Sequence, residues 1–318
     1  MTSPVGYPST MVGPAGQVLR ADAPVAGKVA VLSGGGSGHD PLPAGFVGPG
    51  MLDAAVPGPL FTAPPPGQIL TATRAVDAGR GVLLVVGSHA GDLLNFGMAA
   101  EQAAAQGIRL RMVVVADEST GMVDRSPRRG LAGMVLVQKI AGAAAERGDD
   151  LDAVAAVAGY AAGRLRTMGL ARSGCTLPTT GRRSFEVPPG HVELGIGLHG
   201  ERGRRLQPVR RREELVELLL APVLAELGCP PGEPLLVLVN GMGGTSIEEL
   251  RDARAEALAE LVARGLRPVR SLVGNYATAL DMDGLSISVL RLDDELIRLW
   301  DAPVRTAALR GGHGDVRE

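Results

Sequence analysis

The chain has 318 residues, of which 45% are apolar and 21% are charged, and its formal net charge is -2. This composition supports a packed core in one large or two ordinary domains and argues against intrinsic disorder. The near-neutral charge and the few aromatic residues (one Trp, three Tyr and four Phe) argue against nucleic-acid binding, which needs a basic field and usually stacking rings.

The number of cysteines and the first residues of the chain indicate where in the cell the protein is expected. Cys175 and Cys229 are too few for a disulfide framework or a Cys-rich zinc site. No apolar run reaches the roughly 20 residues that cross a bilayer. No Lys or Arg precedes Arg20, whereas a signal peptide starts with basic residues. We therefore expect a cytoplasmic protein that does not contact a membrane.

Strand-like and helix-like segments alternate along the chain, which is typical of α/β architecture. The Pro cluster at 64–66 is expected to start a helix, since Pro suits the first helical position. In the first half the pattern predicts strands over 29–33, 82–86 and 110–116, and helices over 91–106, 131–146 and 151–167.

A Gly-, Pro- and Thr-rich stretch over 173–183 suggests a boundary, so we predict an N-terminal domain over 1–183 and a C-terminal domain over 184–318. Thr245 and Glu248 are expected to form a capping box at the start of a helix ending near Arg264. The tail after Ala308 is expected to be disordered. The second half otherwise predicts strands over 192–198, 235–239, 269–273 and 286–292, a helix over 213–227 and a short helix from Asp293.

The glycine-rich segment over 34–40 is the first candidate site. Its four glycines let the backbone approach a ligand closely, and its amides can point at an anion. His39 adds a titratable ring at the carboxyl end of a strand, where open α/β sheets build their binding crevices. A plain tight turn is an equally good interpretation of these residues alone.

Asp92 and His199 are further candidates. Asp92 follows the strand over 82–86 and is either a helix cap or a site carboxylate. The segment over 195–200 matches GxGxxG, but an Arg-rich stretch rather than an apolar helix follows it, so the dinucleotide interpretation fails. His199 has small neighbours and either packs structurally or faces a cavity. The remaining histidines are assigned structural roles: His89, His191 and His313.

The sequence contains few signs of a phosphate-binding loop or a metal site. The only lysines, Lys28 and Lys139, are not followed by Ser or Thr, so the GxxxxGK[ST] nucleotide loop is absent. The segment over 241–245 follows a strand and is a second candidate anion loop. No metal site is predicted, because no His pair has i, i+4 spacing with an acid and no DxDxDG loop occurs. Four aspartates near the C-terminus could bind a cation, but the preferred interpretation is a turn and a helix start: Asp281, Asp283, Asp293 and Asp294.

An ordered series of glycine-rich motifs runs along nearly the whole chain. The motifs are VLSGGGSGHDP at 31–41 with AGFVG at 44–48, GD at 91–92 with LNFG at 94–97, RGLAG at 129–133, KIAGA at 139–143, GIGLHGE at 195–201, VNGMGGT at 239–245 and LVGNY at 272–276. This series resembles the substrate-binding K subunit of dihydroxyacetone kinase, the DhaK family, and the resemblance runs from about Arg20 to Ala307.

The resemblance implies two α/β domains, a homodimer and a substrate site at the domain interface. By motif match, His199 would form a covalent hemiaminal with the ketone of dihydroxyacetone, and His39 would hydrogen-bond the bound triose. Asp92 would act as the base toward the hydroxyl that attacks phosphorus. Gly35 and Gly36 would offer backbone contacts to the substrate.

The resemblance also implies that this chain binds no cofactor of its own. ADP or ATP with Mg would be held by a separate DhaL-type L subunit, recharged either by a phosphotransferase relay or by ATP. The missing Lys-containing phosphate loop agrees with this division of labour.

The chain departs from the family pattern in three places. Gly87 stands where the family usually has Lys, Asp40 stands where it has Glu, and the N-terminus is shorter, so an opening helix is expected to be missing. These departures leave open a kinase for another ketose, such as a tetrulose, and a non-catalytic ketose-binding co-regulator. A nucleotide-sugar or cofactor-binding α/β protein is a third alternative, supported only by the glycine loops.

Overall fold

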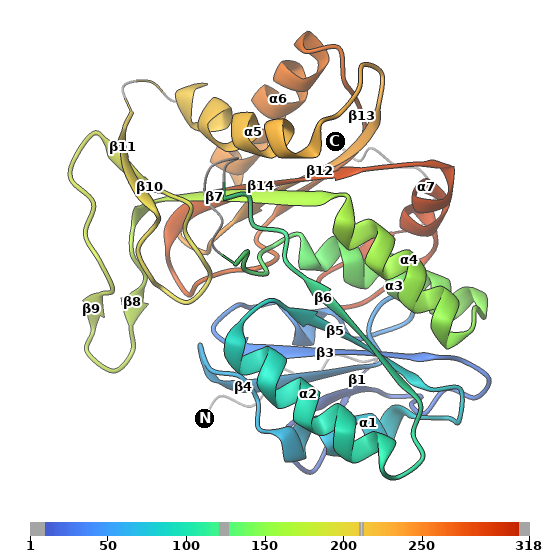
Figure 1. The fold of residues 1–318 in the computed structure, drawn as a ribbon. Coiled ribbons are helices and arrows are strands. Elements are labelled where there is room, and N and C mark those ends of the chain that lie inside the picture. Colours follow the sequence, from blue (N-terminus) through green and yellow to red (C-terminus); the bar gives the residue numbers. More distant parts are fainter. Residues whose placement is uncertain (1–9, 121–126, 210, 212, 312–318) are drawn as a thin grey trace.

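The computed structural model describes residues 10–120, 127–209, 211 and 213–311. Its strands form two six-stranded sheets, one built from the chain up to Val115 and one from Leu165 onward, with two small two-stranded sheets at the periphery. Helices separate the two large sheets and cover their outer faces (Figure 1). Both halves are α/β, as the sequence predicts.

The first sheet has the strand order β1-β2-β4-β3-β5-β6, in which β4, β3, β5 and β6 run parallel. Side chains of β3 alternate between two cores, because successive residues of a strand point to opposite faces. Leu32 packs with helices α1 and α2, and Val31 packs with α3 (Met134–Arg147) and α4 (Leu151–Gly163). The bounds are β1 Thr10–Val12, β2 Val18–Arg20, β3 Ala30–Ser37, β4 Ala54–Leu60, β5 Val82–Gly87, β6 Leu110–Val115, α1 Pro66–Val76 and α2 Ala90–Ala104.

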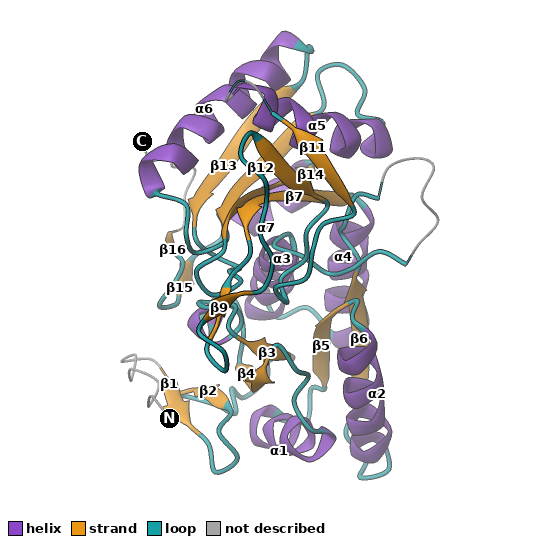
Figure 2. Ribbon diagram, turned by 90° about the vertical axis from the view of Figure 1, so that its left-hand side faces the viewer, coloured by secondary structure: helices purple, strands orange, loops and turns teal. Residues whose placement is uncertain are grey.

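The second sheet has the order β11-β10-β7-β14-β12-β13 and is antiparallel except for the β12/β13 pair. Helices α5 and α6 pack on its outer face (Figure 2). The bounds are β7 Leu165–Ser173, β10 His191–Leu194, β11 Arg205–Pro208, β12 Pro234–Gly241, β13 Arg267–Gly274, β14 Asp283–Arg291, α5 Glu213–Leu227, α6 Ile247–Ala263 and α7 Asp294–Asp301. The short elements are η1 Ala44–Phe46, β8 Thr176–Leu177, β9 Arg182–Arg183, β15 Val304–Arg305 and β16 Arg310–Gly311.

Helix α3 (Met134–Arg147) lies between the two sheets, beside α4 (Leu151–Gly163) (Figure 2). Every residue of α3 from Met134 to Ala145 is buried. Gly142 lets this helix approach the segment after η1, since a Cβ there would lie 2.3 Å from the Met51 Cα. One continuous apolar core therefore joins the two halves of the chain.

Most predicted elements are confirmed to within a few residues, including the helix start at the Pro cluster, where Pro66 opens α1. The helix predicted over 151–167 is wrong at its end, because α4 stops at Gly163 and β7 begins at Leu165. Strands β10 and β14 hydrogen-bond β7 from both sides. The boundary predicted near residue 183 consequently falls inside the part of the chain that builds the second sheet.

Three local predictions need correction. Ser246, not Thr245, caps α6, because the Ser246 hydroxyl accepts a hydrogen bond from the Glu249 amide at 3.2 Å. The glycine segment over 34–40 is partly strand, since β3 continues to Ser37. After Ala308 the chain still forms β16, which pairs with β15. Residues 312–318, including His313, lie outside the described residues.

Within the described ranges, none of the helices has both the length and the apolarity that a bilayer span requires.

Candidate active site

A small cavity of about 20 Å³ lies where the carboxyl ends of β3 and β5 meet the loop after β10. All the residues predicted for the site line it: Gly35, Gly36, His39, Asp92 and His199. The first four come from the first half of the chain and His199 from the second. The structure thus brings together, between the two halves, residues that are distant in sequence.

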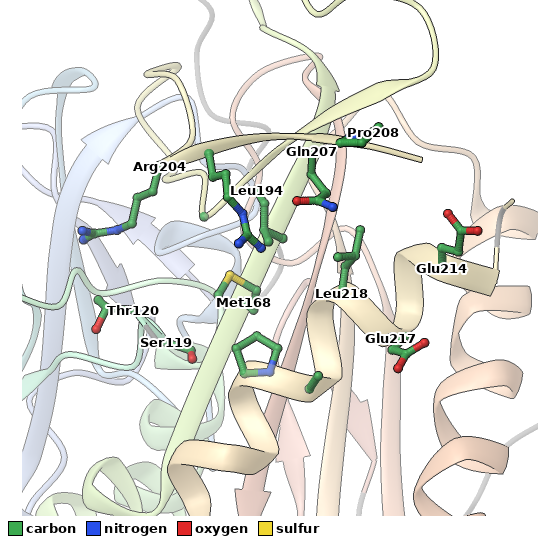
Figure 3. A pocket seen from close by; sticks show the side chains of 14 residues that line it. Ser119, Thr120, Met168, Leu194, Arg204, Gln207, Pro208, Glu214, Glu217 and Leu218 are labelled. Carbon is green, nitrogen blue, oxygen red and sulfur yellow. The ribbon is translucent and has the colours of Figure 1, made fainter. Parts of the chain in front are cut away.

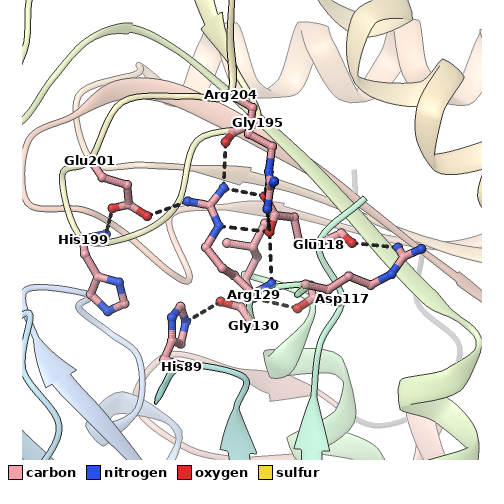
Figure 4. A network of polar contacts seen from close by, with 11 residues as sticks. His89, Asp117, Glu118, Arg129, Gly130, Gly195, His199, Glu201 and Arg204 are labelled. Carbon is pink, nitrogen blue, oxygen red and sulfur yellow. Dashed lines mark hydrogen bonds and ion pairs between the residues drawn. The ribbon is translucent and has the colours of Figure 1, made fainter. Parts of the chain in front are cut away.

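Arg129 and Glu201 fix the backbone that carries His199 (Figure 4). The Glu201 carboxylate accepts a hydrogen bond from the His199 amide at 2.9 Å and another from the Arg129 guanidinium at 2.6 Å. Arg129 also donates to the carbonyl oxygen of Gly195 at 2.7 Å, at the start of the same loop. The His199 loop is therefore held at both ends by one side chain that precedes α3.

The buried Glu118 carboxylate holds Arg129 in turn. It accepts hydrogen bonds from the Arg129 and Arg204 guanidinium groups. Burial by itself would raise the pKa of Glu118, but these two arginines lower it to about 2. Glu118 is consequently ionised at neutral pH, and its pairs anchor the arginine that positions the His199 loop.

Three imidazole rings converge at the cavity. The His199 ring centroid lies 5.1 Å from that of His39 and 4.6 Å from that of His89, with both pairs edge to face. Phe61 stacks on His39 with the centroids 5.4 Å apart. Burial, followed by the proximity of His89, His39 and Arg129, lowers the pKa of His199 to about 3. The His199 ring is therefore neutral at pH 7.

His39 is fixed by the second half of the chain. Its Nδ1 lies 2.9 Å from the Thr278 carbonyl oxygen, and the Thr278 amide donates to the His39 carbonyl oxygen at 3.2 Å. A carbonyl oxygen only accepts, so Nδ1 carries the hydrogen and Nε2 is the unprotonated nitrogen in the neutral ring. Burial lowers the pKa of His39, which keeps the ring neutral.

Asp92 lies in the first turn of α2 and is 6% exposed. Its Oδ1 has no hydrogen-bond partner among the described residues. Burial raises the pKa of Asp92 to about 6. Gly35 runs close to this carboxylate, since a Cβ there would lie 3.9 Å from Asp92 Oδ2. The cavity therefore contains an unpartnered carboxylate that is mostly ionised at pH 7 and able to accept a proton.

The sequence-based prediction that His89 has a structural role is incomplete. Its ring lines the cavity, and its Nε2 lies 2.9 Å from the Gly130 carbonyl oxygen. The rule that singled out Asp92, a position just beyond the carboxyl end of β5, applies to His89 equally. Arg129 and Glu201 belong to the motifs RGLAG and GIGLHGE, but their roles, like that of Phe61, depend on side-chain contacts between distant segments and could not be read from the sequence.

The second predicted anion loop, over 241–245, is not supported. The amides of Met242 and Gly244 already donate to backbone oxygens of the neighbouring segment, at 2.9 Å each. Gly243 is required by close packing, since a Cβ there would lie 1.8 Å from the Leu280 carbonyl oxygen. The glycines of this loop thus serve a backbone-to-backbone contact.

Three of the four C-terminal aspartates lie where the sequence predicts, with Asp281 in a turn and Asp293 and Asp294 at the start of α7, whereas Asp283 begins strand β14 and pairs with Arg172. Asp281 accepts two hydrogen bonds from Thr176, and Asp293 caps α7. Among the residues that the structure describes, no group of three or more His, Cys, Asp or Glu side chains is arranged to hold a metal ion.

A larger pocket of about 540 Å³ lies between β7, β10, β11 and α5 (Figure 3). Met168, Leu194 and Leu218 supply part of its wall, and Arg204 connects it to Glu118. None of the predicted site residues lines this pocket.

Comparison with known proteins identifies the family. The sequence matches the family described as the Dak1 domain over residues 8–308. The dihydroxyacetone-binding subunit DhaK of the PEP-dependent dihydroxyacetone kinase of Escherichia coli (strain K12) is 39% identical, with 93% of this chain and 90% of that protein covered. D-erythrulose kinase of Mycolicibacterium smegmatis is 42% identical over 95% of this chain, but the match spans only 52% of that protein.

A solved structure of similar shape is the dihydroxyacetone kinase operon co-activator Dha-DhaQ. It superposes with a TM-score of 0.92 at 31% identity, with 96% of each chain covered. The proteins that this chain resembles include both kinases and a co-activator by name, so the resemblance alone does not decide the activity. The Dak1 match across most of the chain, the DhaK relative and the shared two-part α/β fold show that this chain belongs to the Dak1 family, to which the K subunits of dihydroxyacetone kinases belong.

Proposed function

We propose that this chain is the substrate-binding subunit of a dihydroxyacetone kinase, in which His199 holds the ketone covalently while a separate nucleotide-carrying subunit supplies the phosphoryl group. The observation that carries the proposal is the pairing, in one cavity, of a neutral imidazole with a buried, unpartnered carboxylate. His199 offers a nucleophile, and Asp92 offers a base. The DhaK relative, whose name describes it as dihydroxyacetone-binding, supports the substrate class.

Adduct formation uses the lone pair of the neutral His199 ring. One imidazole nitrogen bonds to the carbonyl carbon, and the C=O π bond breaks, so the oxygen becomes a hydroxyl. The N–H proton of the other ring nitrogen is released while the former carbonyl oxygen gains a proton, so the adduct is a neutral hemiaminal. The low pKa of His199 favours this step, because a protonated ring has no lone pair to donate.

Phosphoryl transfer uses Asp92. Its carboxylate takes the proton of a terminal hydroxyl as that oxygen bonds to phosphorus, and the bond from phosphorus to the donor nucleotide oxygen breaks. A base works best when its pKa lies near the working pH, and burial raises the pKa of Asp92 to about 6. The nucleotide, ADP or ATP with Mg, is assigned to a DhaL-type partner subunit and not to this chain.

The cavity, at about 20 Å³, has room for roughly one water molecule. A triose needs more space, so binding requires the lining side chains or the two halves of the chain to move apart. A covalent bond suits such a small ligand, which offers few atoms for non-covalent contact. Requiring a carbonyl also rejects polyols such as glycerol. We further propose, from the family resemblance, that the chain forms a homodimer.

A second candidate function is non-catalytic: a co-regulator that binds the ketose without phosphorylating it. Gly87 favours it, because the resemblance places a Lys there, and Gly87 lines the cavity without supplying that charge. The similarity to the co-activator structure points the same way. A related kinase for a tetrulose is also consistent with the erythrulose kinase relative.

One experiment separates these functions. The purified chain is mixed with an ADP-loaded L-type subunit, ATP and either dihydroxyacetone or erythrulose, and ketose phosphate is measured by mass spectrometry. The kinase proposal expects product with the wild type, none with Asp92→Asn, and full activity with His191→Ala, a control at a partly exposed histidine outside the cavity. Product from Asp92→Asn at the wild-type rate would contradict the assigned base.

The adduct is tested on the chain alone. Intact-mass spectrometry after incubation with dihydroxyacetone should show a mass increase equal to the whole ligand, since hemiaminal formation releases no water. The increase should disappear in His199→Ala and persist in Asp92→Asn. An adduct without turnover supports the co-regulator, and the absence of both binding and adduct with either ketose refutes both candidate functions.

A further inference from the structure

His89 lies at the substrate cavity although nothing in the proposed chemistry uses it. It is the N-cap residue of α2, three positions before Asp92, and its ring stands edge to face with His199 at 4.6 Å (Figure 4). It also lines the cavity that His39 and Asp92 share. A polar ring at this place is available to any ligand that reaches His199.

The hydrogen bond of His89 to Gly130 determines which ring nitrogen is available. Its Nε2 lies 2.9 Å from a carbonyl oxygen, which only accepts, so Nε2 carries the hydrogen. Burial lowers the pKa of His89, so the ring is neutral and Nδ1 is an unprotonated acceptor. No described residue donates a hydrogen bond to that Nδ1. His39 presents the same situation with the nitrogens exchanged, since its Nδ1 faces Thr278 and its Nε2 is the acceptor.

Gly87 makes room for this ring. A Cβ at Gly87 would lie 3.3 Å from His89 Cδ2 and 3.6 Å from the Met134 sulfur. A longer side chain at position 87 would therefore compete with the imidazole for the same space. The position of the His89 imidazole in this packing therefore goes together with a glycine at position 87.

We propose that His89 is a specificity-determining residue that accepts a hydrogen bond, at Nδ1, from a hydroxyl of the ketose bound at His199. The proposal rests on the proposed ketose binding and goes beyond it by naming the ligand class. Because His39 Nε2 and His89 Nδ1 are both unprotonated, the site has two imidazole hydrogen-bond acceptors beside His199. Ketones with a hydroxyl on each carbon next to the carbonyl use both acceptors, whereas a monohydroxy ketone uses only one.

The test compares dihydroxyacetone with hydroxyacetone, which lacks one hydroxyl, by isothermal titration of the full chain. Two variants of His89 separate the roles of its two ring nitrogens. His89→Gln keeps a donor near the Nε2 position and removes the Nδ1 acceptor, whereas His89→Asn keeps an oxygen near Nδ1 and gives up the Gly130 contact. Thermal unfolding of each variant establishes that it folds, and His191→Gln is the matched control outside the cavity.

The wild type should prefer dihydroxyacetone, and His89→Gln should reduce that preference by about 3- to 10-fold, the value of one neutral hydrogen bond. His89→Asn should retain more of the preference than His89→Gln, and His191→Gln should retain all of it. A preference unchanged within twofold in His89→Gln, while the wild type binds through His199, overturns the role of His89 alone. A wild type that binds neither ketone overturns this inference together with the proposed function.

A measurement on the wild type avoids any dependence on variant folding. The chain has five histidines, so ¹⁵N spectra of a histidine-labelled sample can be assigned. The free protein should show an unprotonated Nδ1 at His89, and its signal should move toward the hydrogen-bonded position with dihydroxyacetone. A protonated Nδ1 in the free protein, or a signal that does not move in the adduct, overturns the proposal.

Discussion

Replacing Asp92 by Asn should make the folded protein more stable at neutral pH. The side chain is 6% exposed, and its Oδ1 has no hydrogen-bond partner among the described residues. Ionising such a carboxyl is unfavourable in the folded state, and for this reason burial raises the pKa of Asp92 from 3.8 to about 6. An amide of the same shape never ionises, so it avoids that unfavourable charge.

The magnitude and sign of this change in the free energy of unfolding follow from the difference between the Asp92 pKa in the folded and unfolded states. Below pH 3.8 the carboxyl is protonated in both states and contributes no difference. As the pH rises from 3.8 through about 6, the unfolded state loses its proton first, so the free energy of unfolding of the wild type falls. A shift of about 2 pKa units corresponds to roughly 3 kcal/mol. The unbonded amide of the Asn variant costs about 1 to 2 kcal/mol at every pH, which leaves a net gain of about 1 to 2 kcal/mol at pH 8.

The assay is urea unfolding of wild type and variant at several pH values between 4 and 8. Asp281→Asn is the matched control. Partial burial by itself would raise the pKa of Asp281, but two hydrogen bonds from Thr176 lower it below 3.8, so the stabilisation by its carboxylate is nearly complete by pH 5. The Asp281→Asn variant should therefore be less stable than the wild type by a nearly constant amount from pH 5 to pH 8. A stability difference for Asp92→Asn that is independent of pH over this range would refute the reasoning, as would a variant that is less stable than wild type at pH 8.

Three other predictions concern packing, capping and the ion pairs, and each is checked by the free energy of unfolding in urea. Gly142→Ala should destabilise by about 1 to 3 kcal/mol, because its Cβ has no room, whereas Gly159→Ala, with nothing within 4 Å of the new Cβ, should stabilise by about 0.5 to 1 kcal/mol. Ser246→Ala should destabilise by about 1 kcal/mol through loss of the α6 cap, and no loss would reject that cap. Arg129→Ala should destabilise by roughly 2 to 4 kcal/mol at pH 7, because it leaves the buried Glu118 carboxylate with a single arginine. The loss should be smaller near pH 2, where Glu118 takes up a proton. An equal loss of stability at both pH values would contradict the ion-pair account.

The parallel core strands could be predicted because their apolar runs are short and end at turn residues. Strand β5 has no polar residue and is buried throughout, so burial on both faces matches its composition. Strand β7 could not be predicted in this way. It contains Arg166, Thr167 and Gly169 and directly follows an Ala-rich helix, and only pairing with β10 and β14 makes it a central strand.

The capping prediction failed for a related reason. Thr245 and Ser246 are both good N-cap residues, and the local sequence does not choose between them. In the fold, the Thr245 hydroxyl donates to the Gly284 carbonyl oxygen at 2.8 Å, so it serves the contact with β14. Ser246 then caps the helix.

The α/β class, the glycine-rich strand end beside His39 and the motif series that resembles the DhaK family were all visible in the order of the residues alone. These features are local or follow from chain order, so they can be recognised without a fold. The folded chain was needed to show that His39, His89 and His199 share one cavity and that Arg129 holds the His199 loop, because these contacts join segments that are distant in sequence. The altered pKa values of His199 and Asp92 likewise exist only after folding, because burial and neighbouring charges cause them.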